Sequence, residues 1–326
     1  MNCTGSIAFT PAIYSLKIIK MNIKNIRLLV IILFTSHYMS AQQDAQYTQY
    51  MYNPSIINPA YAGSRDAMSI FGLYRSQWVG LDGAPQTGTF SLHTPIENSK
   101  LGLGFSLVND RIGPSDETNL AADISYTIDV SYRYKLAFGV KASANLLNVD
   151  YTKLDIFDPS DPRFQENVEN QFSPNVGAGV YLYSDNTYVG LSAPALLETK
   201  NYDGSSTYVA KEKIHYYLMA GHVFDLDYNL KFKPSALVKM TEGAPLQVDL
   251  SANFLFNEKF TAGVAYRWSA ALSALVGFQI NDGLFVGYAY DAETTKLANY
   301  NSGSHEVFLR FELFKKYNKI VSPRFF

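Results

Sequence analysis

Apolar and polar residues alternate with a period of two along most of the chain beyond residue 67. Residues 135–145 and 246–256 show this most clearly, because one face of each window is apolar while the other is rich in polar side chains. Successive side chains of a β-strand point to opposite faces, so the pattern predicts strands with one apolar face. No stretch after residue 41 has 18 consecutive apolar residues, so no membrane-spanning helix is expected.

Fourteen windows of this kind can be counted, which is an even number. Many have about ten residues, which suits a tilted strand crossing a bilayer and exceeds the usual five or six of a soluble strand. Short connections alternate with longer ones, as in outer-membrane barrels. The expected strands are 68–77, 86–93, 100–109, 118–128, 133–145, 175–183, 187–193, 214–224, 230–239, 245–256, 259–268, 271–280, 284–291 and 304–313.

The pattern therefore predicts an all-β fold, a transmembrane antiparallel β-barrel of about 14 strands. Every backbone N–H and C=O in hydrocarbon must be paired within the protein, and an even number of antiparallel strands can close on itself. A soluble β-sandwich is the alternative, because its strands alternate too. Its outer face would carry charge, whereas here the polar faces are rich in Gly, Ser, Ala and Asn, as expected of a wet lumen.

The first 41 residues are expected to be removed during export. Residues 21–27 are basic, residues 28–34 are apolar, and Ala41 offers a cleavage site, so the segment is typical of a secretory signal peptide. The apolar core is too short to span a bilayer. In this interpretation translation starts at Met21, residues 1–20 are an upstream extension, and the chain leaves the cytoplasm by the Sec route.

Composition narrows the possible functions. Of the 326 residues, 14% are aromatic and only 17% are charged, which excludes a disordered polypeptide. Without residues 1–41 the chain has 23 basic and 29 acidic residues, a net charge of −6, and no basic stripe. Nucleic acid is therefore not an expected partner. Cys3, the only cysteine, would be lost with the leader, which excludes disulfides and cysteine-based sites.

Side chains able to support catalysis or metal binding form no recognisable motif, so we expect no enzyme, no cofactor and no metal site. The histidines lack metal-ligand spacing, and no Gly-x-Ser-x-Gly elbow is present. Asp155, Asp158 and Asp161 could hold calcium, although a solvated acidic loop is the better interpretation. Glycines at 102, 104, 177 and 179 lie inside strand windows, where we expect them to relieve crowding between strands. The histidines considered are His93, His215, His222 and His305.

Two Asn-Pro pairs stand close together in the N-terminal segment, at residues 53–54 and 58–59. Each proline fixes its own φ and pushes the preceding Asn out of the helical region, so the segment should be stiff and bent. Such rigidity suits a plug or cap against the periplasmic mouth. An ordered lead-in to the first strand is an equally good interpretation.

These stretches, together with the hairpin that joins the first two strands, resemble the PorP/SprF family of Bacteroidetes outer-membrane proteins attached to the type IX secretion system. The likeness spans the mature chain, although residues 146–240 carry no family landmark. Each block alone is weak, and together they are specific. The matching residues are Asn53, Pro54, Asn58, Pro59, Tyr61, Gly63, Tyr74, Arg75, Gln77, Trp78, Gly80, Gly83, Pro85, Asp110, Gly113, His305, Glu306, Pro323, Arg324 and Phe326.

The resemblance implies a non-enzymatic barrel of the cell outer membrane that assists secretion or surface attachment of a specific cargo. In gliding relatives the cargo is a very large adhesin recognised by its C-terminal secretion domain, and in other relatives the protein is associated with the periplasmic ring of the secretion machine. Its expected partners are outer-membrane lipid, secretion components and the cargo. A channel or carrier for small or hydrophobic solutes is the alternative, and an outer-membrane hydrolase ranks last.

The expected organisation has four parts. Residues 1–41 are the signal peptide with its upstream extension, and residues 42–67 are a periplasmic lead-in or plug. Residues 68–313 are the barrel, and residues 314–326 are a periplasmic tail. The sequence names neither the cargo nor the loops that bind it.

Overall fold

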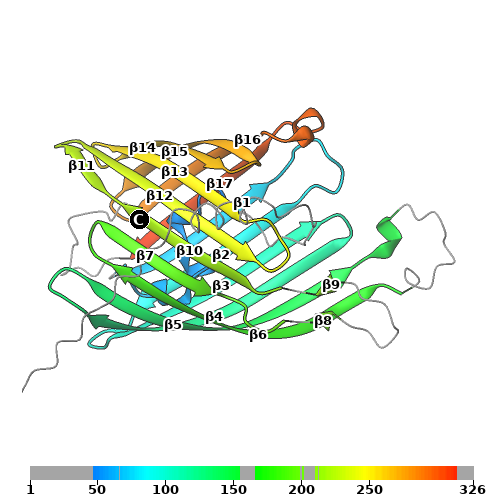
Figure 1. The fold of residues 1–326 in the computed structure, drawn as a ribbon, viewed down its shortest axis with the longest axis horizontal. Helices are drawn as coiled ribbons and strands as arrows, with labels where there is room; N and C mark the ends of the chain where they lie inside the picture. The colour runs from blue at the N-terminus through cyan, green and yellow to red at the C-terminus, as the bar shows by residue number, and fades with distance from the viewer. Residues whose placement is uncertain are drawn as a thin grey trace, which may run out of the picture. The chain divides into compact units, whose positions relative to one another are not determined.

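The strands of the chain wrap into a barrel in a computed structural model that describes residues 47–65, 67–154, 166–198, 200–201, 210–211 and 213–313 (Figure 1). The described residues belong to one compact unit spanning residues 39–326. Among them, no helix is long and apolar enough to cross a membrane. The predicted leader, residues 1–41, and the predicted tail, residues 314–326, lie outside the described residues.

The barrel strands begin and end close to the positions that the alternation predicts. The longest are β4, β5 and β6, with 15, 15 and 16 residues. The bounds are β1 (Met68–Ser76), β2 (Gln86–Pro95), β3 (Leu101–Ile112), β4 (Ser115–Asp129), β5 (Lys135–Val149), β6 (Val168–Tyr183), β7 (Thr187–Ala193), β8 (Lys200–Asn201), β9 (Ala210–Lys211), β10 (His215–His222), β11 (Phe224–Asp227), β12 (Leu230–Thr241), β13 (Gln247–Phe256), β14 (Phe260–Arg267), β15 (Ala271–Asn281), β16 (Leu284–Glu293) and β17 (Ser304–Leu313).

Fourteen of these strands form a closed antiparallel ring, which confirms the predicted fold class. Each pairs with its neighbours in sequence, β10 pairs with both β7 and β12, and β1 pairs with β17 to close the barrel. Two small features add to the ring. Strand β11 continues the line of β10 and pairs with β12, while β8 and β9 form a separate two-stranded sheet.

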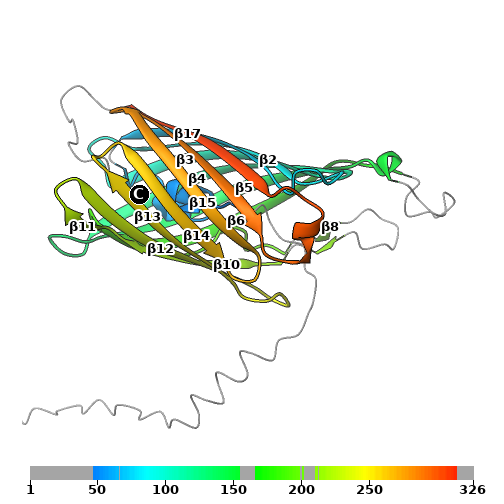
Figure 2. The ribbon, with the colours of Figure 1, turned by 90° about the horizontal axis from the view of Figure 1, so that it is seen from above.

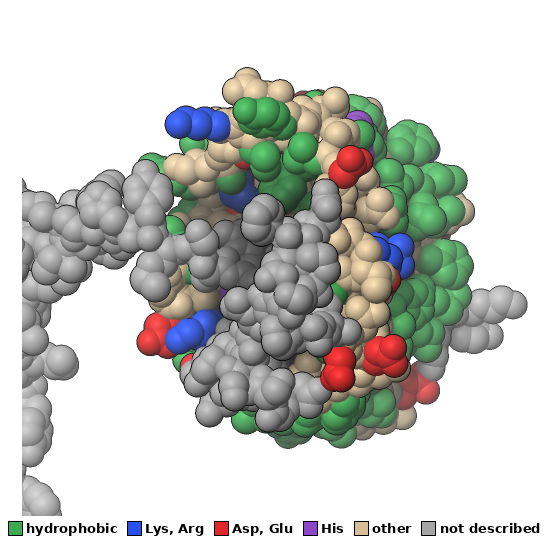
Figure 3. Space-filling model, turned by 90° about the vertical axis from the view of Figure 1, so that its right-hand side faces the viewer, with side chains coloured by type: hydrophobic (Ala, Val, Ile, Leu, Met, Phe, Trp, Pro, Cys, Tyr) green, Lys and Arg blue, Asp and Glu red, His purple; other side chains and the backbone are tan. Residues whose placement is uncertain are grey.

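The apolar face of the alternating pattern points out of the barrel. In β5, Phe138 and Val140 are 46% and 56% exposed, whereas Lys141 is 4% exposed. In β17 the outward residues Val307 and Leu309 are likewise exposed. Such large apolar side chains, repeated on every second residue, are unfavourable in water and suit contact with lipid. Figure 3 shows hydrophobic side chains along the outside of the wall.

The two ends of the barrel differ in the length of their connections. At the end where β1 begins, called here the turn end, the connections β2–β3, β4–β5, β6–β7, β13–β14 and β15–β16 have two to five residues. The opposite end, called the loop end, carries longer connections such as β1–β2, β5–β6 and β16–β17. Figures 1 and 2 show both ends, and Figure 3 views the loop end.

The structure departs from the predicted strands at several places, one of which is the expected connection 194–213, where β8 and β9 lie. Strands β5 and β6 run on to Val149 and back from Val168, so the expected connection 146–174 shortens to 150–167. The expected strand 214–224 ends at His222, and β11 follows after Val223. In the extra length of β5 the apolar residues Leu147 and Val149 are buried on the inner face and Asn148 lies on the outer one, so the pattern of the rest of the strand breaks there.

Candidate functional site

The N-terminal segment, Tyr47 to Arg65, lies along the inner face of the barrel. Near the loop end the Tyr47 hydroxyl is hydrogen-bonded to Thr89 Oγ1 of β2 at 3.1 Å. At the turn end Arg65 pairs with Glu312 of β17. The segment therefore runs the length of the wall before the chain turns back into β1. The sequence left open a plug or cap at the periplasmic mouth and an ordered lead-in to the first strand, and the segment lies inside the barrel and precedes β1.

The two Asn-Pro pairs shape this segment into short 3-10 turns. The segment contains η1 (Tyr50–Tyr52), η2 (Pro54–Ile56) and η3 (Pro59–Tyr61), and a proline begins each of the last two. A first helical position suits proline because its N–H would have no partner there. Asn58 accepts a hydrogen bond from Ala60 N–H at 3.0 Å and donates one to the Val180 carbonyl of β6 at 3.1 Å. One buried side chain thus caps η3 and fixes it to the wall.

An ion cluster of Arg75, Asp291 and Glu306 holds the start of the segment near the loop end. Arg75 Nη1 lies 2.7 Å from Asp291 Oδ2 and 3.1 Å from Glu306 Oε2, and all three side chains are buried. Thr48 and Gln49 donate their backbone N–H groups to the two Glu306 carboxylate oxygens at 3.0 and 2.9 Å. The Thr48 hydroxyl donates to Asp291 at 2.6 Å and accepts from Arg75 at 2.9 Å. These contacts satisfy charges and backbone groups that burial would otherwise penalise.

Two further buried cations bind backbone carbonyls of the segment. Arg267 of β14 donates to the Tyr47 carbonyl at 3.2 Å, and Lys141 of β5 donates to the Ser55 carbonyl at 3.3 Å. Each cation also pairs with a buried carboxylate on a neighbouring strand, Asp249 for Arg267 and Asp123 for Lys141. The segment is therefore anchored to opposite parts of the ring, and no single strand carries it.

Glycines on the inner wall make room for the segment. A Cβ atom at Gly139 of β5 would collide with the backbone of Ala60, and one at Gly179 of β6 would collide with the side chain of Asn58. Gly102 of β3 lies equally close to the segment's backbone. The expectation that these glycines relieve crowding between strands is wrong for Gly179, whose neighbour is the N-terminal segment, whereas a Cβ at Gly102 would meet both the segment and Ser125 of the neighbouring strand β4.

Aromatic side chains line the part of the wall that faces η1. Tyr52 packs against Phe285 and Phe308, with ring centroids 5.4 and 4.9 Å apart, and Phe71 stacks on Phe308 at 5.0 Å. Phe71 thus points inward, which explains why the first predicted strand has apolar residues on both faces.

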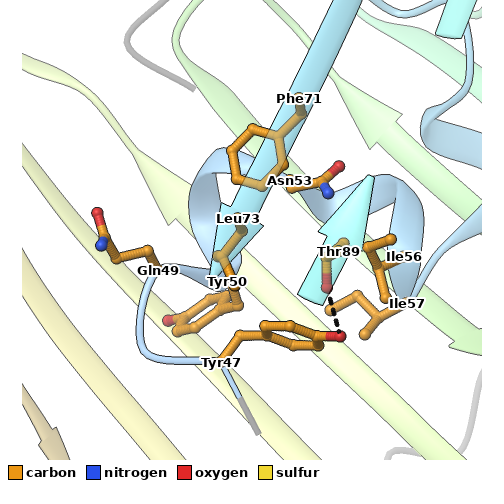
Figure 4. A pocket seen from close by; sticks show the side chains of 9 residues that line it. All are labelled: Tyr47, Gln49, Tyr50, Asn53, Ile56, Ile57, Phe71, Leu73 and Thr89. Atoms are coloured by element: carbon orange, nitrogen blue, oxygen red, sulfur yellow. Dashed lines mark hydrogen bonds between the residues drawn. The ribbon is translucent and has the colours of Figure 1, made fainter. Parts of the chain in front are cut away.

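Little free space remains where the segment meets β1 and β2. The cavity there has a volume of about 10 Å³, about the room that one water molecule needs. Figure 4 shows its lining side chains and the Tyr47–Thr89 hydrogen bond. It is a gap in packing and too small for a solute. The lining residues are Tyr47, Gln49, Tyr50, Asn53, Ile56, Ile57, Phe71, Leu73 and Thr89.

Family-pattern residues of the first hairpin gather at the loop end. Trp78 adopts a φ of 49°, and its indole N–H donates to Glu293 at 3.1 Å. The Val79 N–H donates to the Gly303 carbonyl at 2.9 Å, which ties the hairpin to the residues before β17. The Gly83 carbonyl accepts a hydrogen bond from the backbone N–H of Gly113 at 2.9 Å. The hairpin is thereby braced from both sides.

Other residues of the family pattern lie apart from the segment. Tyr74 is exposed on the outer face of β1. His305 accepts or donates a 2.7 Å hydrogen bond with the Tyr288 hydroxyl, on the outer side of β17. Asp110 accepts a hydrogen bond from Thr87 between β3 and β2 at 2.6 Å. The pattern therefore combines interior, exterior and loop positions.

Several predicted residues cannot be placed. Pro323, Arg324 and Phe326 lie outside the described residues, as do Asp155, Asp158 and Asp161. Within the part of the chain that the structure describes, no group of three or more His, Cys, Asp or Glu side chains is arranged to hold a metal ion.

Sequence reasoning singled out Arg75 and Glu306 and missed the other charged residues that hold the segment. Asp291, Arg267 and Lys141 belong to this missed set. A signal was present, because a charged residue in a strand with one lipid-facing side must point inward. The alternation of inward and outward positions along a strand therefore gives the direction of each charged side chain. Its partner lies far away in sequence and follows only from the folded chain.

Comparison with known proteins gives one family and a set of similar barrels. A family model described as type IX secretion system membrane protein PorP/SprF matches residues 39–311. No protein with a curated description matches the chain. Among solved structures, Omp33 of Acinetobacter baumannii has 10% identity and a TM-score of 0.46, with 76% of this chain and 99% of that chain covered.

Two further solved barrels have comparable values. The CymD monoaromatic hydrocarbon channel has 11% identity and a TM-score of 0.48, covering 85% of this chain and 95% of that one. A Pseudomonas aeruginosa FadL homologue has 14% identity and a TM-score of 0.42, covering 79% and 93%. Likeness at this level concerns the fold alone.

Proposed function

Because this chain belongs to the PorP/SprF family of type IX secretion system membrane proteins, we propose that it is a non-enzymatic outer-membrane barrel that assists secretion or surface attachment of a specific cargo. The cargo that fits best is a large adhesin of the gliding type, recognised through its C-terminal secretion domain. The chain reaches the outer membrane by the Sec route after loss of its signal peptide. Its other partners are components of the secretion machine.

The occupied interior is the observation that supports recognition over transport. A solute channel needs an open lumen, and a carrier needs a cavity of several hundred Å³. Here residues 47–65 lie along the inner wall, and the cavity beside them has about 10 Å³. Buried ion pairs on several strands fix the segment, so opening the barrel along this wall would leave charges without partners.

Cargo docking belongs at the loop end. Connections on a rigid scaffold are the usual sites of recognition, and the long connections of this barrel are gathered there. The hairpin 77–85 is braced by hydrogen bonds to residues 113 and 302–304, so it offers a fixed surface. An extended strand or an apolar patch of the cargo could bind to such a surface without any covalent step.

The test compares surface and secreted proteins of cells with and without this gene, complemented by two variants. In one variant residues 79–84 of the loop end become a Gly-Ser linker, and in the control residues 130–134 of the turn end are replaced in the same way. We expect deletion to remove one or a few large surface proteins, the control to restore them, and the first variant not to. An unchanged surface proteome, or a defect in solute uptake alone, would favour the channel alternative.

A further inference from the structure

Within the part of the chain that the structure describes, strand β11 has a neighbour on one side only. The ring pairs every other barrel strand on both sides, whereas among the described strands β11 pairs with β12 alone. It keeps the register of β10, because Gly221 pairs with Ser235 and Phe224 pairs with Phe232. It therefore extends the wall past the end of β7. Figures 1 and 2 show it projecting at the turn end.

The free edge of β11 carries backbone groups that point away from the barrel sheet. The Val223 N–H donates to the Asn186 carbonyl at 2.7 Å, on the β7 side. Backbone groups of a strand alternate between its two edges, so those of Asp225 point to the same side. The chain beyond Asn186 has already turned back into β7 there. The Asp225 N–H and C=O thus face the open edge, while those of Phe224 face β12.

The side chains of this hairpin are exposed, apolar on one face of β11 and acidic on the other. All four residues of β11 are exposed. Phe224 and Leu226 are 46% and 54% exposed on one face, and Tyr228 beside them is 93% exposed. Asp225 and Asp227 supply negative charge on the other face, where Lys231 lies 3.9 Å from Asp225. The unpaired N–H and C=O groups of an exposed edge can pair with a further strand, and a short edge limits that pairing to a short strand.

We propose that β11 receives an extended polypeptide strand of a partner protein, in which apolar residues alternate with basic ones. The apolar residues would pack beside Phe224 and Leu226, and the basic ones would lie opposite Asp225 and Asp227. A register shift between Asp225 and Asp227 keeps the edge short, which suits one short strand and disfavours open-ended stacking. The binding surface is inferred from the exposed edge of β11 alone. The further statement that the partner belongs to the secretion machine, on the side of the turn end, rests on the proposed function.

The test uses a purified barrel in zwitterionic nanodiscs and a synthetic peptide of four Val-Lys repeats, with a block peptide of four valines and four lysines as control. Binding is read by fluorescence anisotropy. The matched variants are Asp225→Asn and Asp225→Pro, which are both uncharged, and only the proline lacks the N–H. Proline is tolerated on an edge strand, so the ladder to β12 should survive. Unchanged heat-modified gel migration checks the folding of both.

We expect the alternating peptide to bind, and to bind the Asp225→Pro variant about fivefold more weakly than Asp225→Asn, the factor that one lost backbone hydrogen bond is typically worth. Amide hydrogen exchange of the unmodified barrel gives an answer without any variant, because the peptide should protect the Asp225 amide. Equal binding by both variants, equal binding of the block peptide, or an unprotected Asp225 amide would overturn the proposal. None of these readouts depends on secretion, so they are independent of the cargo experiment.

Discussion

Arg75 is the residue on which the interior arrangement depends most. It forms ion pairs with both Asp291 and Glu306, and both carboxylates accept hydrogen bonds from the first residues of the N-terminal segment. Burying a charge is costly unless a partner of opposite sign and hydrogen bonds compensate it. The cluster is therefore stable only when all of its members are present. If the segment left, the two carboxylates would lose the hydrogen bonds that Thr48 and Gln49 donate to them.

Replacing Arg75 by Met should destabilise the folded protein. Loss of the cation leaves two buried carboxylates without an ion-pair partner, and breaking a buried pair in this way typically costs about 3–5 kcal/mol. Urea unfolding in phospholipid vesicles measures the free energy of unfolding.

The matched control is Arg111→Met, which removes an arginine from an exposed pair. Arg111 and Asp116 are 62% and 32% exposed in their side chains, and exposed pairs are worth about 0–1 kcal/mol. Equal losses in the two variants would show that the cluster does not hold the segment.

At the scale of elements, the contact between η3 and β5 decides whether the segment fits the wall. A Cβ atom at Gly139 would collide with the backbone of Ala60, whereas nothing lies within 4 Å of a Cβ placed at Gly72 of β1. Both glycines lie inside strands, so their backbone preferences are alike. Only Gly139 faces the segment.

We expect Gly139→Ala to lower the free energy of unfolding by about 1–3 kcal/mol, the usual cost of overpacking. Gly72→Ala should be neutral or slightly stabilising, because glycine weakens a strand interior. Thermal or urea unfolding of the two variants in parallel gives the comparison. A neutral Gly139→Ala variant would mean that η3 does not press against β5.

The strands could be predicted from sequence because lipid imposes an apolar residue at every second position of each strand. Phe138 and Val140 satisfy that rule, and β5 was predicted at nearly its observed start. Residues 146–149 do not satisfy it, because Leu147 and Val149 are buried on the inner face while Asn148 lies on the outer one. The period-two signal therefore ends before the strand does.

The position of the N-terminal segment could not be predicted in the same way. The Asn-Pro pairs indicate bends, and the bends are present at η2 and η3. Their destination depends on contacts such as Asn58 with Val180, which lie 122 residues apart. For that reason the sequence alone did not distinguish a plug or cap from an ordered lead-in to the first strand. The open edge at β11 was hidden too, because the alternation continues from β10 into β11 without a break.

At the scale of the whole molecule, the path of the chain indicates toward which side of the membrane the segment's first residue, Tyr47, lies. Tyr47 lies near the loop end, beside Arg267 at the end of β14, and the segment reaches the turn end only at Arg65. Long loops face the cell exterior in bacterial outer-membrane barrels. The start of the segment should therefore lie toward the cell surface, the side opposite to that expected from sequence.

An epitope inserted directly before Tyr47 should bind antibody on intact cells, as should one in the loop-end connection 242–246. An epitope in the turn 130–134 should bind only after the outer membrane is permeabilised. Flow cytometry of intact and permeabilised cells measures both. Labelling of the 242–246 epitope without labelling of the one before Tyr47 would contradict the chain path.

The most direct test of the account is single-channel conductance in planar bilayers. The chain's own residues 47–65 are largely buried inside the barrel, and the proposed function requires that the barrel does not conduct solutes. We expect the intact protein to show no steady conductance and a variant lacking residues 47–63 to open stable pores. Steady conductance of the intact protein, equal to that of the deletion variant, would contradict it.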